Sequence, residues 1–225
     1  LSMEAIIDFY REVYIHSRIS HPSIIKFNGY SLINFKNKNK PVIVTEYVSN
    51  TALQNILDSY STSQEILNDT KQLIIIYGIA SGMSYLHLHG ILHRNLMPEK
   101  ILLDNNYYPK ISGLDFIKEI SPNLKMSLFE SRDDSNLKTE SAYFAPETLT
   151  DLQYSKSSEV YSFGLIVYSI LKQERQYFFD ISDILKRRKE MDLNDEIPDF
   201  YADLLSRCLS EDPNNRPSFD EIVHD

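Results

Sequence analysis

The chain has 225 residues, of which 42% are hydrophobic and 24% charged, and its formal net charge is −9 at pH 7. This composition is typical of a folded globular protein and excludes a disordered or fibrous chain. The negative charge argues against a nucleic-acid backbone or an anionic membrane as partner, because either requires a clustered Lys and Arg surface. The basic run KNKNK at 36–40 is expected to form a solvated turn and not a docking site.

The apolar and cysteine patterns point to a protein without a membrane segment. Cys208 is the single cysteine and cannot form an internal disulfide, which favours a reducing compartment such as the cytoplasm. It lies in the helically patterned stretch YADLLSRCLS, so a buried structural thiol is expected and not a nucleophile. The most apolar stretch, LIIIYGIASGM at 73–83, is too short and too interrupted by Gly and Ser to span a bilayer.

The hydrophobic periodicity predicts a sheet-containing region followed by a helical one. Apolar residues at positions 3, 6, 7, 10 and 13 predict an amphipathic helix over 3–19, which ends before Pro22. Two β-rich runs at 23–33 and 41–48 predict an antiparallel pair. Helices are then predicted at 51–60, 70–89, 157–171, 183–190, 199–209 and 218–225, with two short β-like pieces at 100–104 and 109–113 around the turn NNYY.

Four short motifs follow one another in a specific order. HRNL begins at His93 with Pro98 behind it, APE covers 145–147, YSFG covers 161–164, and Arg216 precedes Pro217. Together they resemble the eukaryotic protein kinase domain, in its serine/threonine or tyrosine-kinase-like branch, over almost the whole chain. The resemblance implies an α+β, protein-kinase-like bilobal fold. A truncated small β-containing lobe at 1–48, with a regulatory helix and two strands, would join a mainly helical large lobe at 49–225 to form one kinase-like domain.

The resemblance assigns His93, Arg94 and Asn95 to the catalytic loop, with Asn95 at the position of the catalytic base. An amide cannot accept a proton near neutral pH, so general-base assistance of roughly 10²- to 10⁴-fold is forfeited. Lys100 stands where the family carries a second magnesium ligand, and a cation there repels the metal. The loop therefore resembles a phosphoryl-transfer loop that lacks its reactive groups.

The principal magnesium aspartate is also missing in the favoured alignment. In the segment KISGLDF, the aspartate position falls on Gly113, which has no side-chain oxygen, so no metal site is expected. A rival alignment shifted by two residues makes Asp115 the metal ligand. It requires the strand leading into the motif to slip by two residues as well.

The resemblance places the adenine-binding hinge at TEYV, 45–48, where backbone groups of Glu46 and Val48 would meet an adenine edge, and it places Leu102 among the cofactor-contacting residues. Backbone groups are present whatever the side chain, so these residues leave ATP binding open. Glu12 occupies the place of the helix glutamate that pairs with a strand lysine. No lysine occurs before Lys26, and no glycine-rich loop precedes the first helix.

Other matches concern the scaffold. Glu147 and Arg216 match a buried pair with a structural role. Glu159 replaces an aspartate that braces the catalytic loop, and its extra methylene group argues against the same bracing. Kinases contain an internal column of side chains that is usually apolar. The resemblance places His16 in this column, together with Phe27, Leu114 and His93.

Four parts of the catalytic apparatus are altered or missing: the base, the two metal positions and the front of the small lobe. In an active kinase, each of these parts acts on a different part of the transition state. The first hypothesis is therefore a catalytically inactive pseudokinase, a protein-binding or allosteric regulatory module in signalling whose partner is a protein, for example an active kinase. No cofactor is expected, although ATP stays open and magnesium is disfavoured. The alternative is a weakly active serine/threonine kinase, using ATP, whose glycine-rich loop and lysine lie upstream of Leu1. A third possibility is a folded spacer.

Overall fold

The computed structural model describes residues 3–59, 67–114, 118–119, 142–151, 153–174 and 197–224. Its helices are α1 (Met3–Arg18), α2 (Leu53–Ser59), α3 (Asp69–Leu88), α5 (Pro146–Asp151), α6 (Lys156–Lys172), α8 (Asp199–Cys208) and α9 (Phe219–His224). Its strands are β1 (Phe27–Ser31), β2 (Val42–Thr45), β3 (Ile91–Leu92), β4 (Ile101–Leu103), β5 (Pro109–Ile111) and β6 (Lys118–Glu119). The 3-10 turns η1 (Pro98–Lys100) and η3 (Pro213–Asn215) follow the catalytic-loop segment and α8.

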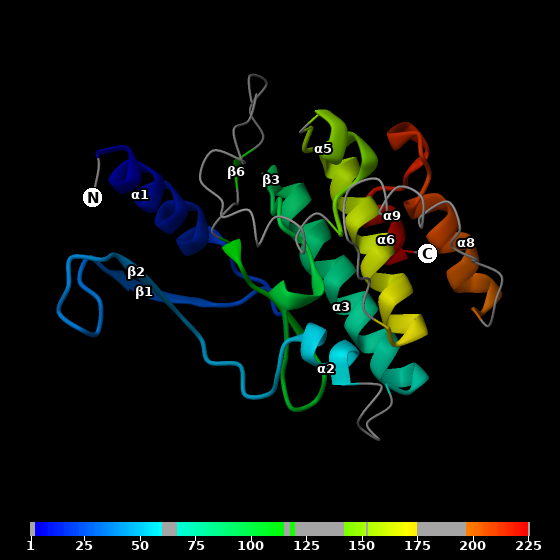
Figure 1. Ribbon diagram of the computed structural model, residues 1–225, viewed down its shortest axis with the longest axis horizontal. Coiled ribbons are helices and arrows are strands. Elements are labelled where there is room, and N and C mark those ends of the chain that lie inside the picture. Colours follow the sequence, from blue (N-terminus) through cyan, green and yellow to red (C-terminus); the bar gives the residue numbers. More distant parts are fainter. Residues whose placement is uncertain are drawn as a thin grey trace.

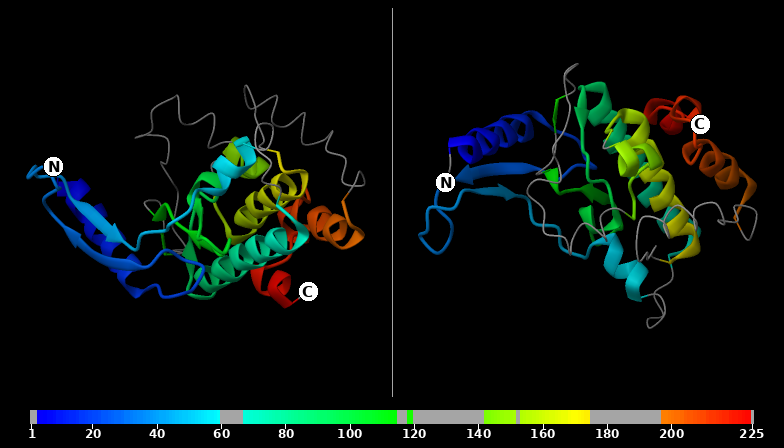
Figure 2. Two further views of the ribbon diagram at one scale, coloured as in Figure 1. Left: turned by 90° about the horizontal axis from the view of Figure 1, so that it is seen from below. Right: turned by 45° about the horizontal axis from the view of Figure 1, so that its top comes forward.

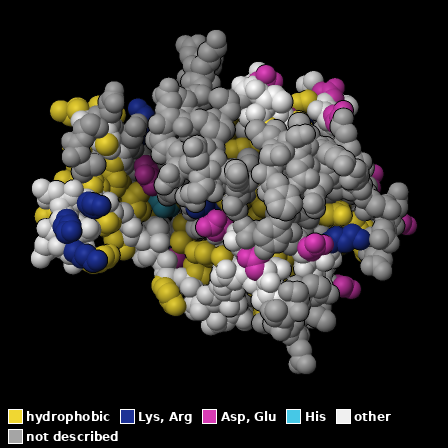
Figure 3. All heavy atoms as spheres, viewed as in Figure 1, with side chains coloured by type: hydrophobic (Ala, Val, Ile, Leu, Met, Phe, Trp, Pro, Cys, Tyr) yellow, Lys and Arg dark blue, Asp and Glu magenta, His cyan; other side chains and the backbone are white. Residues whose placement is uncertain are grey.

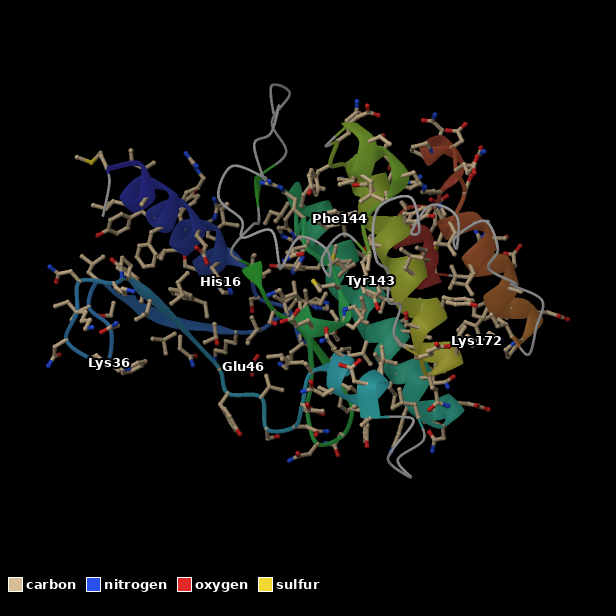
Figure 4. All side chains as sticks on the ribbon, viewed as in Figure 1. His16, Lys36, Glu46, Tyr143, Phe144 and Lys172 are labelled. Carbon is tan, nitrogen blue, oxygen red and sulfur yellow. The ribbon has the colours of Figure 1, made fainter. Side chains whose placement is uncertain are left out.

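The small lobe consists of α1 lying beside the β1–β2 sheet (Figures 1 and 2). β1 and β2 are antiparallel, with Tyr30 opposite Ile43, and a register shift lies between Phe27 and Gly29. The loop that joins them carries the basic run 36–40, all exposed, at the outer tip of the molecule (Figures 3 and 4, where Lys36 is labelled). The prediction of a solvated basic turn is confirmed.

The centre of the large lobe is formed by two helices that bury most of their circumference. α3 begins behind the N-cap Asn68, whose side chain accepts a hydrogen bond from the Lys71 N–H, and it buries residues such as Ile75 and Met83. α6 begins with a capping box formed by Ser155 and Ser158 and is buried from 158 to 167 without interruption. A helix that is apolar all round belongs in a core, and α6 occupies that place here.

The β4–β5 hairpin packs closely against α3, and this contact positions the candidate site. The hairpin register is Ile101 opposite Ile111. A Cβ at Gly78 would lie 2.4 Å from a Pro109 ring carbon, and one at Gly82 would lie 2.7 Å from Ile111 Cδ1, so only glycines on α3 admit the strand at this distance.

The predicted α+β class and kinase-like arrangement are confirmed, and most predicted helices lie within a few residues of the observed ones. The prediction at 183–190 lies outside the described residues. The strand predicted at 23–33 is shorter than expected, because Ile24 and Ile25 do not belong to β1. They are buried against β5 instead, where the Ile25 N–H donates to the Ile111 carbonyl at 2.9 Å and the Ile111 N–H donates to the Ser23 carbonyl at 2.8 Å. β3, β6 and α5 were not predicted; the two strands have two residues each, which is too short to show a period.

Cys208 is fully buried at the end of α8, as predicted. Burial raises the pKa of its thiol to about 12, against the opposing positive charges of Arg207 and Arg216. The folded protein therefore holds the proton more tightly than the unfolded chain, in which the ordinary pKa is 9.0, and this contribution to stability is lost as pH rises from 9 towards 12.

We expect Cys208 to resist a thiol reagent at pH 8 in the native protein and to react fully in denaturant. Absorbance of the released thiolate measures both reactions. Rapid labelling of the native protein would contradict this prediction.

None of the helices in the described ranges is long and apolar enough to cross a membrane.

Candidate functional site

The segment from His93 to Asn95 is buried in the interior, with exposed fractions of 0%, 3% and 1% in sequence order. Arg94 has a φ of 68°, a left-handed conformation that is uncommon for a residue with a side chain. Such a conformation persists where the surroundings enforce it. Its guanidinium also lies over the Tyr154 ring, with Cζ 5.3 Å from the ring centroid.

Glu159 holds this conformation from α6. Its Oε1 accepts a hydrogen bond from the Arg94 backbone N–H, and its Oε2 accepts one from His87 Nε2 at 2.7 Å. All three groups are buried. The argument from the extra methylene group against this bracing is wrong, because the longer side chain reaches both the loop and a histidine on α3.

His93 links the catalytic-loop segment to the residues that follow β5. Its Nε2 donates to the Ser112 carbonyl at 2.9 Å, and its Nδ1 accepts from the Asn95 N–H at 3.3 Å. These two partners require a neutral imidazole with its proton on Nε2. His93 is therefore a core histidine that orients backbone.

The Asn95 side chain has a different environment. Both its Oδ1 and its Nδ2 are buried and make no hydrogen bond with any described residue. A buried amide without partners costs stability, so the position retains hydrogen-bonding capacity at an energetic penalty. It has no group that can take up a proton.

Lys100 and Gly113 face one another next to this loop. Gly113 has a φ of 72°, and a Cβ placed on it would lie 2.5 Å from Lys100 Cδ. The Lys100 carbonyl accepts hydrogen bonds from the Ser112 N–H at 2.8 Å and the Ser112 hydroxyl at 3.0 Å, which fixes the two segments side by side.

The donor groups at positions 95, 100 and 113 do not fit a magnesium ion. They supply one amide oxygen, one ammonium group and no carboxylate, whereas Mg²⁺ prefers an octahedron of oxygens. Within the described ranges, no group of three or more His, Cys, Asp or Glu side chains could hold a metal. Asp115, the ligand of the rival alignment, lies outside the described residues.

The hinge is tied to β5 by a side chain that sequence reasoning missed. Glu46 Oε1 accepts the Lys26 N–H at 2.8 Å and pairs with Lys110 Nζ at 3.0 Å. Burial by itself would raise the pKa of Glu46, but the Lys26 hydrogen bond and the Lys110 ammonium outweigh it and lower the pKa. Lys110 is the cross-strand partner of the half-buried Leu102, so Glu46 and Leu102 lie on either side of it. Figure 4 labels Glu46 just beyond β2.

The other two predicted contact residues lie apart. Val48 is half-buried and packs on the core of the large lobe. Glu12 is half-buried on α1, one turn before His16, which is buried with its ring centroid 5.5 Å from that of Phe27. Figure 4 places His16 near the end of α1 that approaches the large lobe.

The predicted scaffold pair is confirmed. The Arg216 guanidinium binds Glu147 through two bonds, Nη1 to Oε1 at 2.6 Å and Nη2 to Oε2 at 3.0 Å. Its Nε donates to the Ser210 carbonyl at 2.9 Å, and its Cζ lies 4.8 Å from the Tyr161 ring centroid. This bidentate geometry connects α5 to the segment before α9.

The role of His87 was not predicted from the sequence. His87 is buried and bonded to Glu159, which is 72 positions away along the chain. No local spacing connects the two residues. One sequence feature could have suggested this contact. A histidine lies on a strongly apolar helix, and an acidic residue lies at the start of a second apolar helix.

These contacts define a protein-kinase-like domain. The family model described as "Protein tyrosine and serine/threonine kinase" matches residues 2–225, and the chain belongs to this family.

Curated relatives support the same assignment. A probable serine/threonine-protein kinase of Dictyostelium discoideum is 32% identical over 231 residues, covering 98% of this chain and 16% of the relative. Ephrin type-A receptor 5 of Gallus gallus is 30% identical over 225 residues, covering 96% of this chain and 21% of the receptor. Another probable serine/threonine-protein kinase of Dictyostelium discoideum is 29% identical, covering 96% and 20%. The chain thus spans about a fifth of the length of these relatives.

Proposed function

We propose that the chain is a pseudokinase: a kinase-fold domain without phosphoryl-transfer activity that acts as a protein-binding or allosteric regulatory module in signalling. One observation carries the proposal. The Lys100 stem lies against Gly113, so a cationic side chain fills the space beside the position where the family resemblance places the magnesium aspartate.

Magnitudes favour loss of activity. Asparagine in place of the catalytic base, at Asn95, lowers the rate of phosphoryl transfer by roughly 10²- to 10⁴-fold. A typical kinase turnover of about 1 to 100 per second would then fall to roughly 1 to 0.0001 per second. Metal ions neutralise charge on the transferring phosphoryl group, which is a separate contribution. Losing both removes two independent sources of transition-state stabilisation.

The scaffold supports a folded binding module. The Glu147–Arg216 pair connects α5 to the segment before α9, and the Glu159–His87 contact connects α6 to α3. A partner would be a protein, such as an active kinase, because the net charge of −9 disfavours nucleic acid. We place this function in the cytoplasm on the basis of the single, buried cysteine.

The alternative is a weakly active serine/threonine protein kinase that uses Asp115 as its metal ligand. The names of two Dictyostelium relatives favour it, since both are probable serine/threonine-protein kinases. Pro98 and Glu99 also resemble the serine/threonine type of catalytic loop, although Met97 stands where that type carries lysine.

The test is phosphoryl transfer by the natural full-length protein, measured as release of labelled γ-phosphate to peptides and to the protein itself with Mg²⁺ or Mn²⁺. We expect no transfer above the rate of the matched variants Asn95→Ala and Asp115→Ala. Metal-dependent turnover that Asp115→Ala abolishes would instead establish the enzyme and the shifted alignment.

A further inference from the structure

We infer that the Lys100 side chain takes the place of the divalent metal at this site, so that a nucleoside triphosphate would bind here without such a metal. The inference rests on the proposed function, because it concerns the same residues. It adds a ligand class and the residue that recognises it.

The geometry makes Lys100 and Gly113 a matched pair. A Cβ on Gly113 would lie 2.5 Å from Cδ, 3.0 Å from Cγ and 3.2 Å from Cε of Lys100. A side chain at position 113 and the lysine stem in its present position would therefore occupy the same space. The absence of a side chain at 113 makes room for the lysine, and the lysine occupies the room that a metal-binding carboxylate would need.

Lys100 is held in this place by its backbone. Its N–H donates to the Met97 carbonyl at 2.9 Å, and its carbonyl accepts two hydrogen bonds from Ser112. Its ammonium forms no ion pair with any described carboxylate, in contrast to Lys110, which binds Glu46 at 3.0 Å. A half-buried cation without a counter-ion among the described residues is partly desolvated, so an anion placed beside it gains more than it would at the surface.

Asn95 is an independent sign of a ligand. Its side-chain amide is 1% exposed and its Nδ2 and Oδ1 lack hydrogen-bond partners among the described residues. Its backbone N–H contacts His93, which contacts Ser112 next to Gly113, so Lys100 and the segment that carries Asn95 both border Ser112. A hydrogen-bond donor and a cation that both lack partners among the described residues suit phosphate oxygens, which accept hydrogen bonds and carry negative charge.

The experiment is ATP binding by calorimetry, in EDTA and in excess Mg²⁺. For the native protein we expect the same Kd in both buffers. Lys100→Met keeps the stem over Gly113 and removes only the charge, so we expect it to weaken binding by about tenfold or more, the value of a charge-assisted hydrogen bond. Lys36→Ala, in the exposed loop, is the charge-matched control and should leave Kd unchanged.

A double exchange tests the matched pair. Lys100→Asn combined with Gly113→Asp removes the lysine and supplies two oxygen ligands, so ATP binding should become magnesium-dependent and Mn²⁺ should bind without nucleotide, as measured by electron paramagnetic resonance. Gly113→Asp alone should bind neither, because its carboxylate would pair with Lys100. Thermal melts check that each variant is folded.

Three results would overturn the inference: native binding that Mg²⁺ strengthens, no native binding in either buffer, or Lys100→Met binding as tightly as Lys36→Ala. The proposed function fails by a different result, namely phosphoryl transfer. Absence of both transfer and binding leaves the pseudokinase proposal standing and rejects only the role of Lys100.

Discussion

Arg216→Ala is expected to lower the free energy of unfolding by about 3–5 kcal/mol, the usual cost of breaking a buried ion pair by removing one partner. The Arg216 side chain is 0% exposed and that of Glu147 is 18% exposed. The substitution leaves the carboxylate of Glu147 without its two guanidinium bonds and the Ser210 carbonyl without its donor. Denaturant titration followed by circular dichroism measures the change.

A matched control is Arg207→Ala. Arg207 also pairs with a carboxylate, Asp203 at 3.1 Å, but those side chains are 38% and 70% exposed. Exposed pairs of this kind contribute about 0.2–1 kcal/mol, so the control should change stability little. Equal effects of Arg216→Ala and Arg207→Ala would contradict a structural role for the buried pair.

Glu159→Ala is expected to destabilise the protein by a similar amount, about 3–5 kcal/mol, because it leaves buried groups without their acceptor. The Arg94 N–H and His87 Nε2 would both lose their partner. Arg94 would also lose the contact that holds its φ of 68°. Glu159→Asp should be destabilising as well, since the shorter side chain cannot span the same two donors.

The interaction itself is measured by a double-mutant cycle with His87→Ala. We expect a coupling free energy of about 0.5–3 kcal/mol between the two positions, as is usual for groups in one hydrogen-bond network. Glu99→Ala, on an exposed residue close to the same loop, is the control and should change stability by less than about 0.5 kcal/mol. Additive effects of Glu159→Ala and His87→Ala would show that the contact does not brace the loop.

The two predictions concern the part of the molecule that kinases use as a framework. Glu159 and Arg216 are buried and join segments that are distant in the chain, whereas Asn95 and Lys100 stand where the family resemblance places reactive groups. We therefore expect substitutions in these framework contacts to change the stability of the fold without altering the residues at positions 95, 100 and 113.

Several features could be predicted from the sequence because they depend on local patterns. The helical period located α1, α3, α6 and α8, and the order of the short motifs located the Glu147–Arg216 pair. The chemistry of Asn95 and Gly113 also follows from residue type alone, since no fold gives an amide a basic pKa near neutrality or a glycine a carboxylate.

Only the tertiary structure could decide contacts between residues far apart in the chain. The bond between His87 and Glu159 joins two helices, and the packing of Lys100 over Gly113 depends on how β5 and η1 meet. Side-chain length suggested that Glu159 could not brace the loop, but reach depends on where the helix places the Cα. The sequence by itself determined which groups are present, and the tertiary structure determined their partners, because burial and distance are set by the packing of distant elements.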